Sequence, residues 1–358
     1  MQINSTGYSF VSMYQSYPSY HGASDITYNL FSEWPAINKL LIQITNSKFS
    51  KKNIISIKKK KGFIGSLINI FLIVLKIKKF SKKYEKNYLI IEGASWAGFS
   101  LILMFLSKII IRNIIVIYHA HNLEYEVRKL KNNFLISFIT FYFEKYIYQN
   151  SLATCVSVKD KNFIRKHYKS DCILFENGIT EVKEEKLFNN KIKKNKFILF
   201  CGSYTYWPNK IAITNILNDK NQIEKIFPNI KFVFTGEGFP EFIDKNILAL
   251  GIIKKTKLVW LIKNCLFFYA PMPRAPGTKI KILEAIYYGA LTICSKPAII
   301  GIKKTKKLKS LVITSKTNLL KNLFKIKDKK KPRVSNEFNE IYNFKNKIKE
   351  FYEKINNL

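Results

Sequence analysis

Two lysines stand at the start of an expected helix, where cations are normally unfavourable. The segment reads "GTKIKILEA" and contains Gly277, Thr278, Lys279, Lys281 and Glu284. The amino end of a helix carries partial positive charge, so each lysine there costs about 0.3–1 kcal/mol unless an anion binds nearby. A diphosphate would make the pair favourable, because its oxygens accept charge-assisted hydrogen bonds. Gly277 leaves room for a ligand, Thr278 could cap the helix, and Glu284 can accept two ribose hydroxyls. Chance is the alternative, since lysine is abundant throughout the chain.

The segment "YHAHNLEYEVR", residues 118–128, concentrates groups that exchange protons. It contains His119, His121, Asn122 and Glu124, directly after an apolar run. Imidazole titrates near neutral pH, and both imidazole and carboxylate can bind sugar hydroxyls. We therefore interpret His119, His121 and Glu124 as candidate catalytic residues. Asn122 could contact the acceptor or cap a helix, and a solvated loop is the alternative for the whole segment.

Three further loops place glycine directly after an apolar run. Gly202 lies in "FCGSYTYWPNK", where Asn209 and Lys210 lead into a helix, and Gly236 lies in "FTGEGFP". Gly22 lies in "SYPSYHGASD", and a helix is expected to begin after it. Glycine allows a ligand to approach the backbone, whose N–H groups can hold a phosphate that a lysine neutralises. The spacing is not GxGxxG, so the dinucleotide-binding fingerprint is absent.

Short apolar runs alternate with helix-length segments, which is typical of parallel sheets covered on both faces. Strands are expected at 8–14, 53–57, 88–92, 113–119, 152–158, 172–176, 197–203, 230–238, 246–251, 265–271 and 291–295. Helices are expected at 63–79, 96–111, 134–149, 159–168, after Pro208, at 256–264, 279–288 and 336–357.

The charged stretch 179–196 interrupts this alternation and is interpreted as a linker. We expect a first domain over 1–180, a second over 181–335, and a C-terminal helix in 336–358 that packs back on the first domain. In such sheets ligands bind beyond the carboxyl ends of the strands, where the loops described above are expected.

Composition points to a folded protein with an anionic partner. The chain has 358 residues and a formal net charge of +37. This excess favours nucleic acid, acidic lipid or phosphorylated substrates, although lysine, isoleucine and asparagine are abundant everywhere, as in chains from AT-rich genomes. The five cysteines occur singly and the four histidines are not at metal-binding spacing, so we expect free thiols and no metal site.

A basic collar surrounds the longest charge-free apolar stretch, residues 62–75. At about 14 residues it is shorter than the ~20 that span a bilayer. A core helix and a membrane-surface helix attracted to acidic lipid are both consistent with it. The polar residues after Met1 predict no secretory signal. We therefore expect a cytoplasmic protein, peripheral on the inner face of the cytoplasmic membrane.

Taken together, these segments resemble a GT-B glycosyltransferase of family 4, over nearly the whole chain. The motifs that carry the resemblance are "GTKIKILEA" and the following "IYYGALTICS", "HNLE" at 121–124, "ENGI" at 176–179, "FCGSYTYWPN" at 200–209 and "CLFFYAPM" at 265–272. The resemblance implies an α/β protein with two Rossmann-like, doubly wound domains that face a cleft. It also implies transfer of a sugar from a nucleotide-diphosphate sugar, with retention at the anomeric carbon and without a metal.

The resemblance also implies roles for individual residues. Glu284 would hold the donor ribose, and Ile253 would lie near the base. The acceptor would lie on the first domain, near Gly22, Asn122 and the two histidines. The diphosphate would be surrounded by Gly277, Thr278, Lys279 and Lys281, with Gly202, Gly236, Asn209 and Lys210 nearby. Two features depart from the family pattern: Pro276 replaces a glutamate that contacts the donor sugar, and only Lys210 approximates an Arg–Lys pair.

The most specific expectation is a transferase that builds bacterial surface polysaccharide or lipopolysaccharide on a glycan or lipid-linked acceptor. A non-hydrolysing sugar-nucleotide epimerase shares the architecture and is one alternative. A nucleic-acid-binding protein would account for the charge but not for the paired α/β units, so we expect no nucleic-acid partner.

Overall fold

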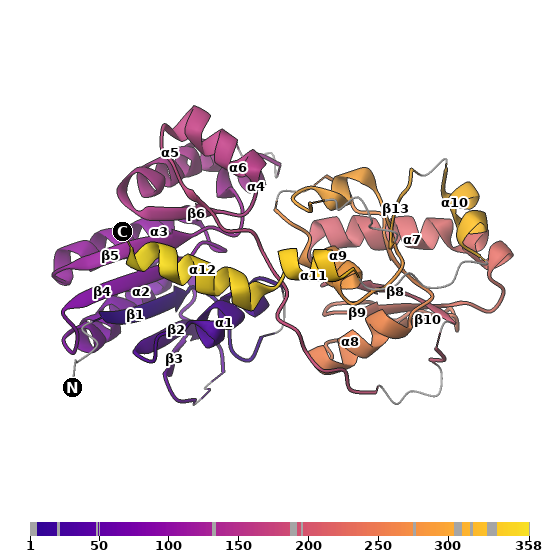
Figure 1. Cartoon of the computed structure of the whole chain (residues 1–358), viewed down its shortest axis with the longest axis horizontal. Coiled ribbons are helices and arrows are strands. Elements are labelled where there is room, and N and C mark those ends of the chain that lie inside the picture. Colours follow the sequence, from indigo (N-terminus) through magenta and orange to yellow (C-terminus); the bar gives the residue numbers. More distant parts are fainter. Residues whose placement is uncertain are drawn as a thin grey trace. The chain divides into compact units, whose positions relative to one another are not determined.

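The computed structural model describes residues 6–19, 22–47, 49, 51–130, 134–186, 192–194, 196–274, 277–303, 310–315, 318–327 and 335–357. The chain divides into two compact units (Figure 1). Unit 1 comprises Met1–Asn177 and Asn346–Leu358, and unit 2 comprises Gly178–Lys345. The chain therefore leaves unit 1 once and returns to it at its C-terminal end.

Unit 1 contains a parallel sheet of seven strands in the order β3-β2-β1-β4-β5-β6-β7. The strands are β1 (Thr6–Ser12), β2 (Lys39–Thr45), β3 (Ile54–Lys58), β4 (Lys86–Glu92), β5 (Ile114–His119), β6 (Leu152–Cys155) and β7 (Ile173–Leu174). The helices are α1 (Gly22–Glu33), α2 (Gly62–Ser81), α3 (Ala97–Ile110), α4 (Glu124–Leu130), α5 (Phe134–Asn150), α6 (Val158–Phe163), which continues as a π-helix over Ile164–Tyr168, and α12 (Phe344–Asn356).

Side-chain alternation along the strands gives this sheet two buried faces. Val11 belongs to the core cluster beneath α2, α3 and α5. Its neighbour Phe10 points the other way and lies 5.2 Å from the ring of Trp34. α12 completes this second face, since Phe351 contacts Trp34 at 6.0 Å and Asn356 Oδ1 accepts a hydrogen bond from Tyr8 Oη at 2.6 Å. Figure 1 shows α12 lying across the sheet.

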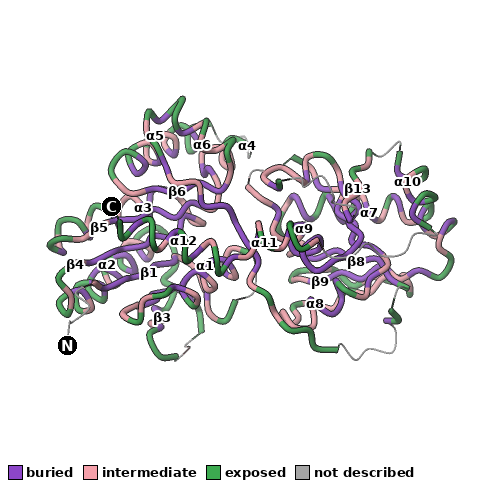
Figure 2. The backbone as a smooth tube through the Cα atoms, viewed as in Figure 1, coloured by how far each residue is buried: buried purple, intermediate pink, exposed green. Residues whose placement is uncertain are grey.

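Unit 2 contains a parallel sheet of six strands in the order β10-β9-β8-β11-β12-β13. The strands are β8 (Phe197–Cys201), β9 (Lys231–Thr235), β10 (Ile247–Ala249), β11 (Phe267–Ala270), β12 (Thr292–Cys294) and β13 (Leu311–Ile313). The helices are α7 (Trp207–Ile226), α8 (Lys255–Asn264), α9 (Ile280–Tyr287), a 3-10 turn (Lys296–Ile299), α10 (Leu319–Ile326) and α11 (Asn336–Ile341). β8, β9 and β11 form the core and are buried almost throughout (Figure 2).

All the expected strands are present, and the predicted α/β class is confirmed. Three elements were not predicted: β2, β13 and α10. β2 is interrupted by a polar residue, Gln43, which is buried because its side chain accepts from the backbone N–H groups of Ser16 and Tyr17, at 2.8 and 2.7 Å. β13 and α10 are short and lie in a lysine-rich region, where the apolar pattern is weak.

Two expectations about chain segments are corrected. The single helix expected over 336–357 is divided into α11 and α12, because the chain between them pairs with Ile179 through a bridge to Asn343. The expected linker 179–196 contacts unit 2 at several of its described residues. Ile179 and Ile192 are buried in unit 2, and the Val182 N–H donates to Tyr288 Oη at 3.0 Å. Because the stretch has few apolar residues, the sequence analysis did not predict that these few would be packed against unit 2.

The strand order reverses between β1 and β4 in unit 1, and between β8 and β11 in unit 2. Parallel α/β sheets bind ligands beyond the carboxyl ends of the strands at such points. The carboxyl edges of the two sheets are therefore the places to seek a site.

Among the described helices, none has both the length and the hydropathy that a bilayer-spanning segment requires.

Candidate functional site

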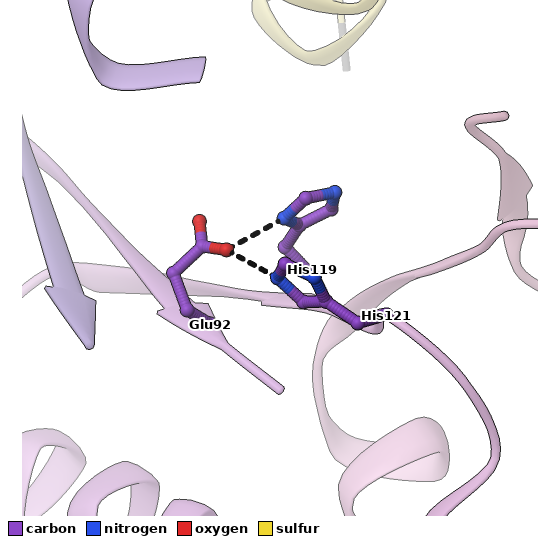
Figure 3. A group of neighbouring side chains, drawn as sticks. All are labelled: Glu92, His119 and His121. Carbon is purple, nitrogen blue, oxygen red and sulfur yellow. Dashed lines mark hydrogen bonds and ion pairs between the residues drawn. The ribbon is translucent and has the colours of Figure 1, made fainter. Parts of the chain in front are cut away.

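A buried carboxylate lies between two imidazoles at the carboxyl edge of the unit 1 sheet (Figure 3). Glu92 ends β4, and His119 ends β5 at the paired position, so the strand register brings them together. Glu92 Oε2 lies 3.0 Å from His119 Nδ1 and 2.7 Å from His121 Nε2. Both predicted histidines therefore belong to one cluster, and sequence analysis missed the carboxylate that joins them.

The surroundings of Glu92 keep its carboxylate ionised. Burial would raise its pKa, but the two imidazoles outweigh burial and hold the pKa at about 2. Oε2 also accepts a hydrogen bond from Thr27 Oγ1 at 2.8 Å, and Thr27 Oγ1 lies 2.7 Å from Tyr14 Oη. Burial lowers the pKa of His121, against the opposing effect of Glu92. At neutral pH this region thus holds a fixed negative charge beside a neutral His121.

Glu92, His119 and His121 are also a ligand set that a divalent ion such as zinc accepts. Their ligand atoms lie within 4.8 Å of one another. Sequence analysis expected no metal site, because spacing along the chain does not reveal a grouping that spans two strands. Both imidazoles here contact the same carboxylate oxygen directly, in the manner of hydrogen bonds.

The carboxylate of Glu124, a predicted catalytic residue, is bound by Arg128. Its Oε2 accepts from Arg128 Nη2 at 3.1 Å. The backbone N–H groups of Glu124 and Tyr125 donate to the two oxygens of Glu144, each at 2.8 Å, so Glu144 caps α4. Burial raises the pKa of Glu144 to about 7, although these N–H groups favour its ionised form.

Two residues expected near the acceptor occupy different environments. Asn122 does not act as the helix cap, since its Oδ1 is buried with no hydrogen-bond partner among the described residues. Gly22 is the first residue of α1 and is exposed. A helix thus begins at this glycine rather than after it, and its backbone remains accessible.

At the carboxyl edge of the unit 2 sheet, three predicted donor residues come together. Lys281 Nζ donates to Asn209 Oδ1 at 2.6 Å, and Asn209 Nδ2 donates to Ser203 O at 2.8 Å. Gly202 has a φ of +144°, and a Cβ there would collide with the Lys281 ammonium and the Asn209 amide. Burial lowers the pKa of Lys281 to about 8, while Cys201 and Glu284 favour its charged form. Sequence reasoning placed these residues in one site, and the structure brings them together.

Glu284 lies in α9 and is buried. Its carboxylate forms an ion pair with Lys255, the first residue of α8, which sequence analysis did not single out. Thr278 is not the helix cap, because Lys279 occupies the N-cap position. Thr278 Oγ1 is buried with no hydrogen-bond partner among the described residues. Lys279 is buried, and its ammonium donates to Gly277 O at 2.7 Å.

The remaining predicted donor residues lie around this centre. Gly236, at the end of β9, has a φ of +133°, and a Cβ there would meet Gly202 O, so the two glycine loops pack backbone to backbone. Lys210 is exposed, with its ammonium 5.6 Å from the Tyr204 ring centroid. Ile253 packs against the core of unit 2. Pro276 lies outside the described residues.

The missed residues differ in how visible they were. Glu92 is the only charged residue of "YLIIE" and ends that apolar run, where a strand reaches the ligand edge, so a signal was present. Lys255 carried no signal, since lysines are frequent along the whole chain. Glu144 lies inside an apolar helix, 20 residues from the N–H group that it caps. Patterns within a short segment cannot reveal a contact between residues so far apart in the sequence.

Comparison with solved structures identifies the fold. This chain resembles HepE from Anabaena in complex with UDP and glucose, with a TM-score of 0.67 and 11% identity over 98% of this chain and 100% of that chain. It resembles WaaG, a glycosyltransferase involved in lipopolysaccharide biosynthesis, with a TM-score of 0.62 and 12% identity over 97% of this chain and 95% of that chain.

A glycosyltransferase from Rickettsia africae has a TM-score of 0.61 and 13% identity, over 99% of each chain. By sequence, no family model and no curated protein matches this chain. At these identities the likeness to solved structures establishes the fold, which is GT-B.

Proposed function

We propose that this protein is a glycosyltransferase that uses a nucleotide-diphosphate sugar. The observation that carries the proposal is the grouping of Lys281, Asn209 and Gly202 at the carboxyl edge of unit 2, with Glu284 one turn along the same helix. A diphosphate needs cations and accessible backbone, and a ribose needs a hydrogen-bond acceptor. The fold supports this proposal, since similar structures include one in complex with UDP and glucose.

Each residue of this group has a role in the proposed mechanism. The ammonium of Lys281 neutralises charge that develops on the departing diphosphate, so no metal is required for this step. Thr278 Oγ1 has no protein partner among the described residues, so it can donate to a phosphate oxygen. Glu284 accepts hydrogen bonds from the ribose hydroxyls, with Lys255 keeping it ionised. Retention at the anomeric carbon and membership of family 4 are part of this proposal.

The acceptor binds at the histidine cluster of unit 1 in this proposal. Imidazole and carboxylate groups at the edge of a parallel sheet suit hydroxyl groups of a sugar. A glycan or lipid-linked acceptor of bacterial surface polysaccharide or lipopolysaccharide biosynthesis fits this chemistry. WaaG, which has the same fold, is involved in lipopolysaccharide biosynthesis.

A thermal-shift panel of UDP-, GDP- and other nucleotide sugars tests the donor site. We expect one nucleotide class to raise the melting temperature, because a ligand that binds only the folded state stabilises it. Glu284→Gln should abolish the shift and leave the unliganded melting temperature within a few degrees. Absence of a shift with every nucleotide sugar would reject the proposal. Interconversion of two nucleotide sugars without an acceptor would indicate an epimerase.

A surface of unit 1 supports attachment to a membrane. α3 packs between α2 and α5, and each of these helices has exposed residues (Figure 2). Several of the exposed residues are large and apolar. On α2 these are Ile64, Ile68, Phe71 and Leu75, at the four- and three-residue spacing of one helix face. We call the exposed outer side of α2, α3 and α5 the apolar face. Monomeric proteins seldom expose such a continuous surface unless it binds something.

The apolar face continues across α5, where Phe134, Phe138, Tyr142 and Tyr146 are exposed at four-residue intervals. The face is bordered by cations, because the residues before α2 are Lys58–Lys61, all exposed. α2 and α3 contain no acidic residue, and the only one in α5, Glu144, is buried. This combination suits the interface of an anionic bilayer, where apolar side chains enter the acyl boundary and lysines contact lipid headgroups.

Sedimentation with vesicles tests the membrane proposal. The protein should sediment with anionic vesicles at low salt and be released from them at high salt. The double substitution Ile64→Glu/Phe138→Glu should abolish sedimentation. Ile243→Glu is the matched control, since Ile243 is a fully exposed apolar residue in unit 2, and it should have no effect. Equal sedimentation with neutral and anionic vesicles, or an unaffected double variant, would contradict the proposal.

A further inference from the structure

The contacts of Glu92 restrict where the two histidines carry their protons. An ionised carboxylate only accepts hydrogen bonds. Its Oε2 lies 3.0 Å from His119 Nδ1 and 2.7 Å from His121 Nε2, so each of these ring nitrogens must carry the hydrogen. In the neutral rings the opposite nitrogens, His119 Nε2 and His121 Nδ1, are then left as acceptors. One carboxylate oxygen thereby fixes a different tautomer in each ring.

Glu92 is itself held in one orientation. It is fully buried at the end of β4, paired in register with His119, and its Oε2 also accepts from Thr27 Oγ1 at 2.8 Å. Thr27 Oγ1 is in turn within 2.7 Å of Tyr14 Oη, so hydroxyl groups from β1–α1 and from α1 support the carboxylate. Glu92 belongs to a strand and Thr27 to a helix, so the hydrogen bond between them joins two regular elements, which keeps a functional side chain in one orientation.

The two imidazoles differ in how accessible they are. The His119 side chain is 1% exposed, whereas the His121 side chain is 8% exposed. His119 also has the ring of Phe175 against it, at 5.3 Å between centroids. A ligand at the carboxyl edge can therefore reach His121, while His119 lies behind it.

We propose that Glu92 is a positioning residue that holds His121 as the Nε2–H tautomer, so that its Nδ1 accepts a hydrogen bond from a hydroxyl of the acceptor sugar. The acceptor as ligand rests on the proposed glycosyltransferase function. The tautomer assignment stands on the geometry alone. A metal ion bound by the three residues is the competing arrangement, and it would require bare nitrogens on the sides that face Glu92.

Nitrogen NMR of the histidine rings tests the tautomers directly. The chain has only four histidines, so His119→Asn and His121→Asn suffice to assign the two ring systems. In the wild-type protein we expect Nδ1–H for His119 and Nε2–H for His121. The opposite pattern in either ring, or a shift of both rings on addition of Zn²⁺, would overturn the proposal. This measurement uses the unaltered protein and needs no substrate.

Glu92→Gln tests the consequence of losing the acceptor-only group. Both rings contact the one position of Oε2. An amide NH2 at that position should turn both rings to the opposite tautomer, whereas an amide oxygen there would keep both tautomers with weaker hydrogen bonds. With the acceptor sugar as varied substrate, kcat/KM should fall about 10–100-fold, as for other residues that orient catalytic groups. Unchanged tautomers together with unchanged kcat/KM would contradict the proposal even if the donor site is correctly assigned.

Discussion

Two helices that follow sheet strands begin in opposite electrostatic surroundings. α4, in unit 1, has the carboxylate of Glu144 on the N–H groups of Glu124 and Tyr125. α9, in unit 2, has no acidic residue in its first turn and begins with Lys279 and Lys281. The first helix thus receives its anion from the chain itself, whereas the second presents cations where an external anion would be stabilising.

The two sheets share the same order in their first six strands, yet different residues lie at their carboxyl edges. In unit 1, side chains such as Glu92 and His119 occupy the edge and hold one another. In unit 2, Gly202 and Gly236 have no side chain there, so Lys281 and Asn209 lie directly against the backbone of Gly202. Topology therefore determines where a site lies, and the residues that end the strands decide which ligand chemistry it can serve.

The sharpest way to break this comparison is to remove the cation at α9. Lys281→Met should lower donor turnover by about 100-fold or more, because a charge-assisted contact to the diphosphate is lost. In the wild-type protein, donor affinity should also fall as pH rises through about 8, where Lys281 loses its proton. A steady-state assay of donor turnover measures the first effect, and isothermal titration with the nucleotide diphosphate at several pH values measures the second.

Lys210→Met is the matched control for that substitution. Lys210 was also assigned to the donor, but it is exposed and its ammonium lies near Tyr204. We expect less than a threefold change in donor affinity. Equal losses in the two variants would show that unit 2 attracts the anion by general positive charge rather than at α9.

A methyl group at Gly202 tests whether the close approach of Lys281 and Asn209 to this backbone matters. Gly202→Ala should reduce donor affinity by about tenfold, since the new Cβ displaces the ammonium and the Asn209 amide. Gly251→Ala is the control, because Gly251 also has a positive φ, +62°, but no atom lies within 4 Å of the added Cβ. Both variants should lose about 1–3 kcal/mol of unfolding free energy from backbone strain, measured by urea denaturation, whereas only Gly202→Ala should bind the donor more weakly.

The chain's own anion at α4 should be detectable as a pH effect on stability. Burial raises the folded-state pKa of Glu144 to about 7 from an ordinary value of 4.5. The folded protein therefore binds this proton more tightly than the unfolded chain, and stability falls as pH rises from about 4.5 to about 7. Glu144→Gln lacks this titration, so its stability relative to wild type should improve by about 2–3 kcal/mol between pH 5 and pH 8. If urea denaturation gave the same stability difference between Glu144→Gln and wild type at both pH values, the assignment would be contradicted.

The donor site was more predictable than the histidine cluster because its residues lie close together in the sequence. Gly277, Lys281 and Glu284 share one short segment, and Gly202 and Asn209 share another. Joining the two segments required only that strands of one sheet end at a common edge. The strand positions followed from apolar runs for the same reason, and the run interrupted by Gln43 was missed.

The histidine cluster could be predicted only in part. His119 and His121 were visible as a pair, but their link to Glu92 depends on β4 and β5 being neighbours in register. The ion pair between Lys255 and Glu284 depends on the packing of α8 near α9. Lysine is so frequent along the chain that Lys255 could not be distinguished from the others. Contacts between distant segments were therefore the part that periodicity and residue type could not supply.

The position of α12 has a consequence for how the protein is made. The aromatic face of the first sheet, with Tyr8 and Trp34, is covered by α12, whose 13 residues are Phe344–Asn356. During translation these rings are made long before the helix that covers them, since Tyr8 and Asn356 are 348 positions apart. This aromatic surface can therefore be buried only after α12 has emerged, and until then it is exposed to aggregation.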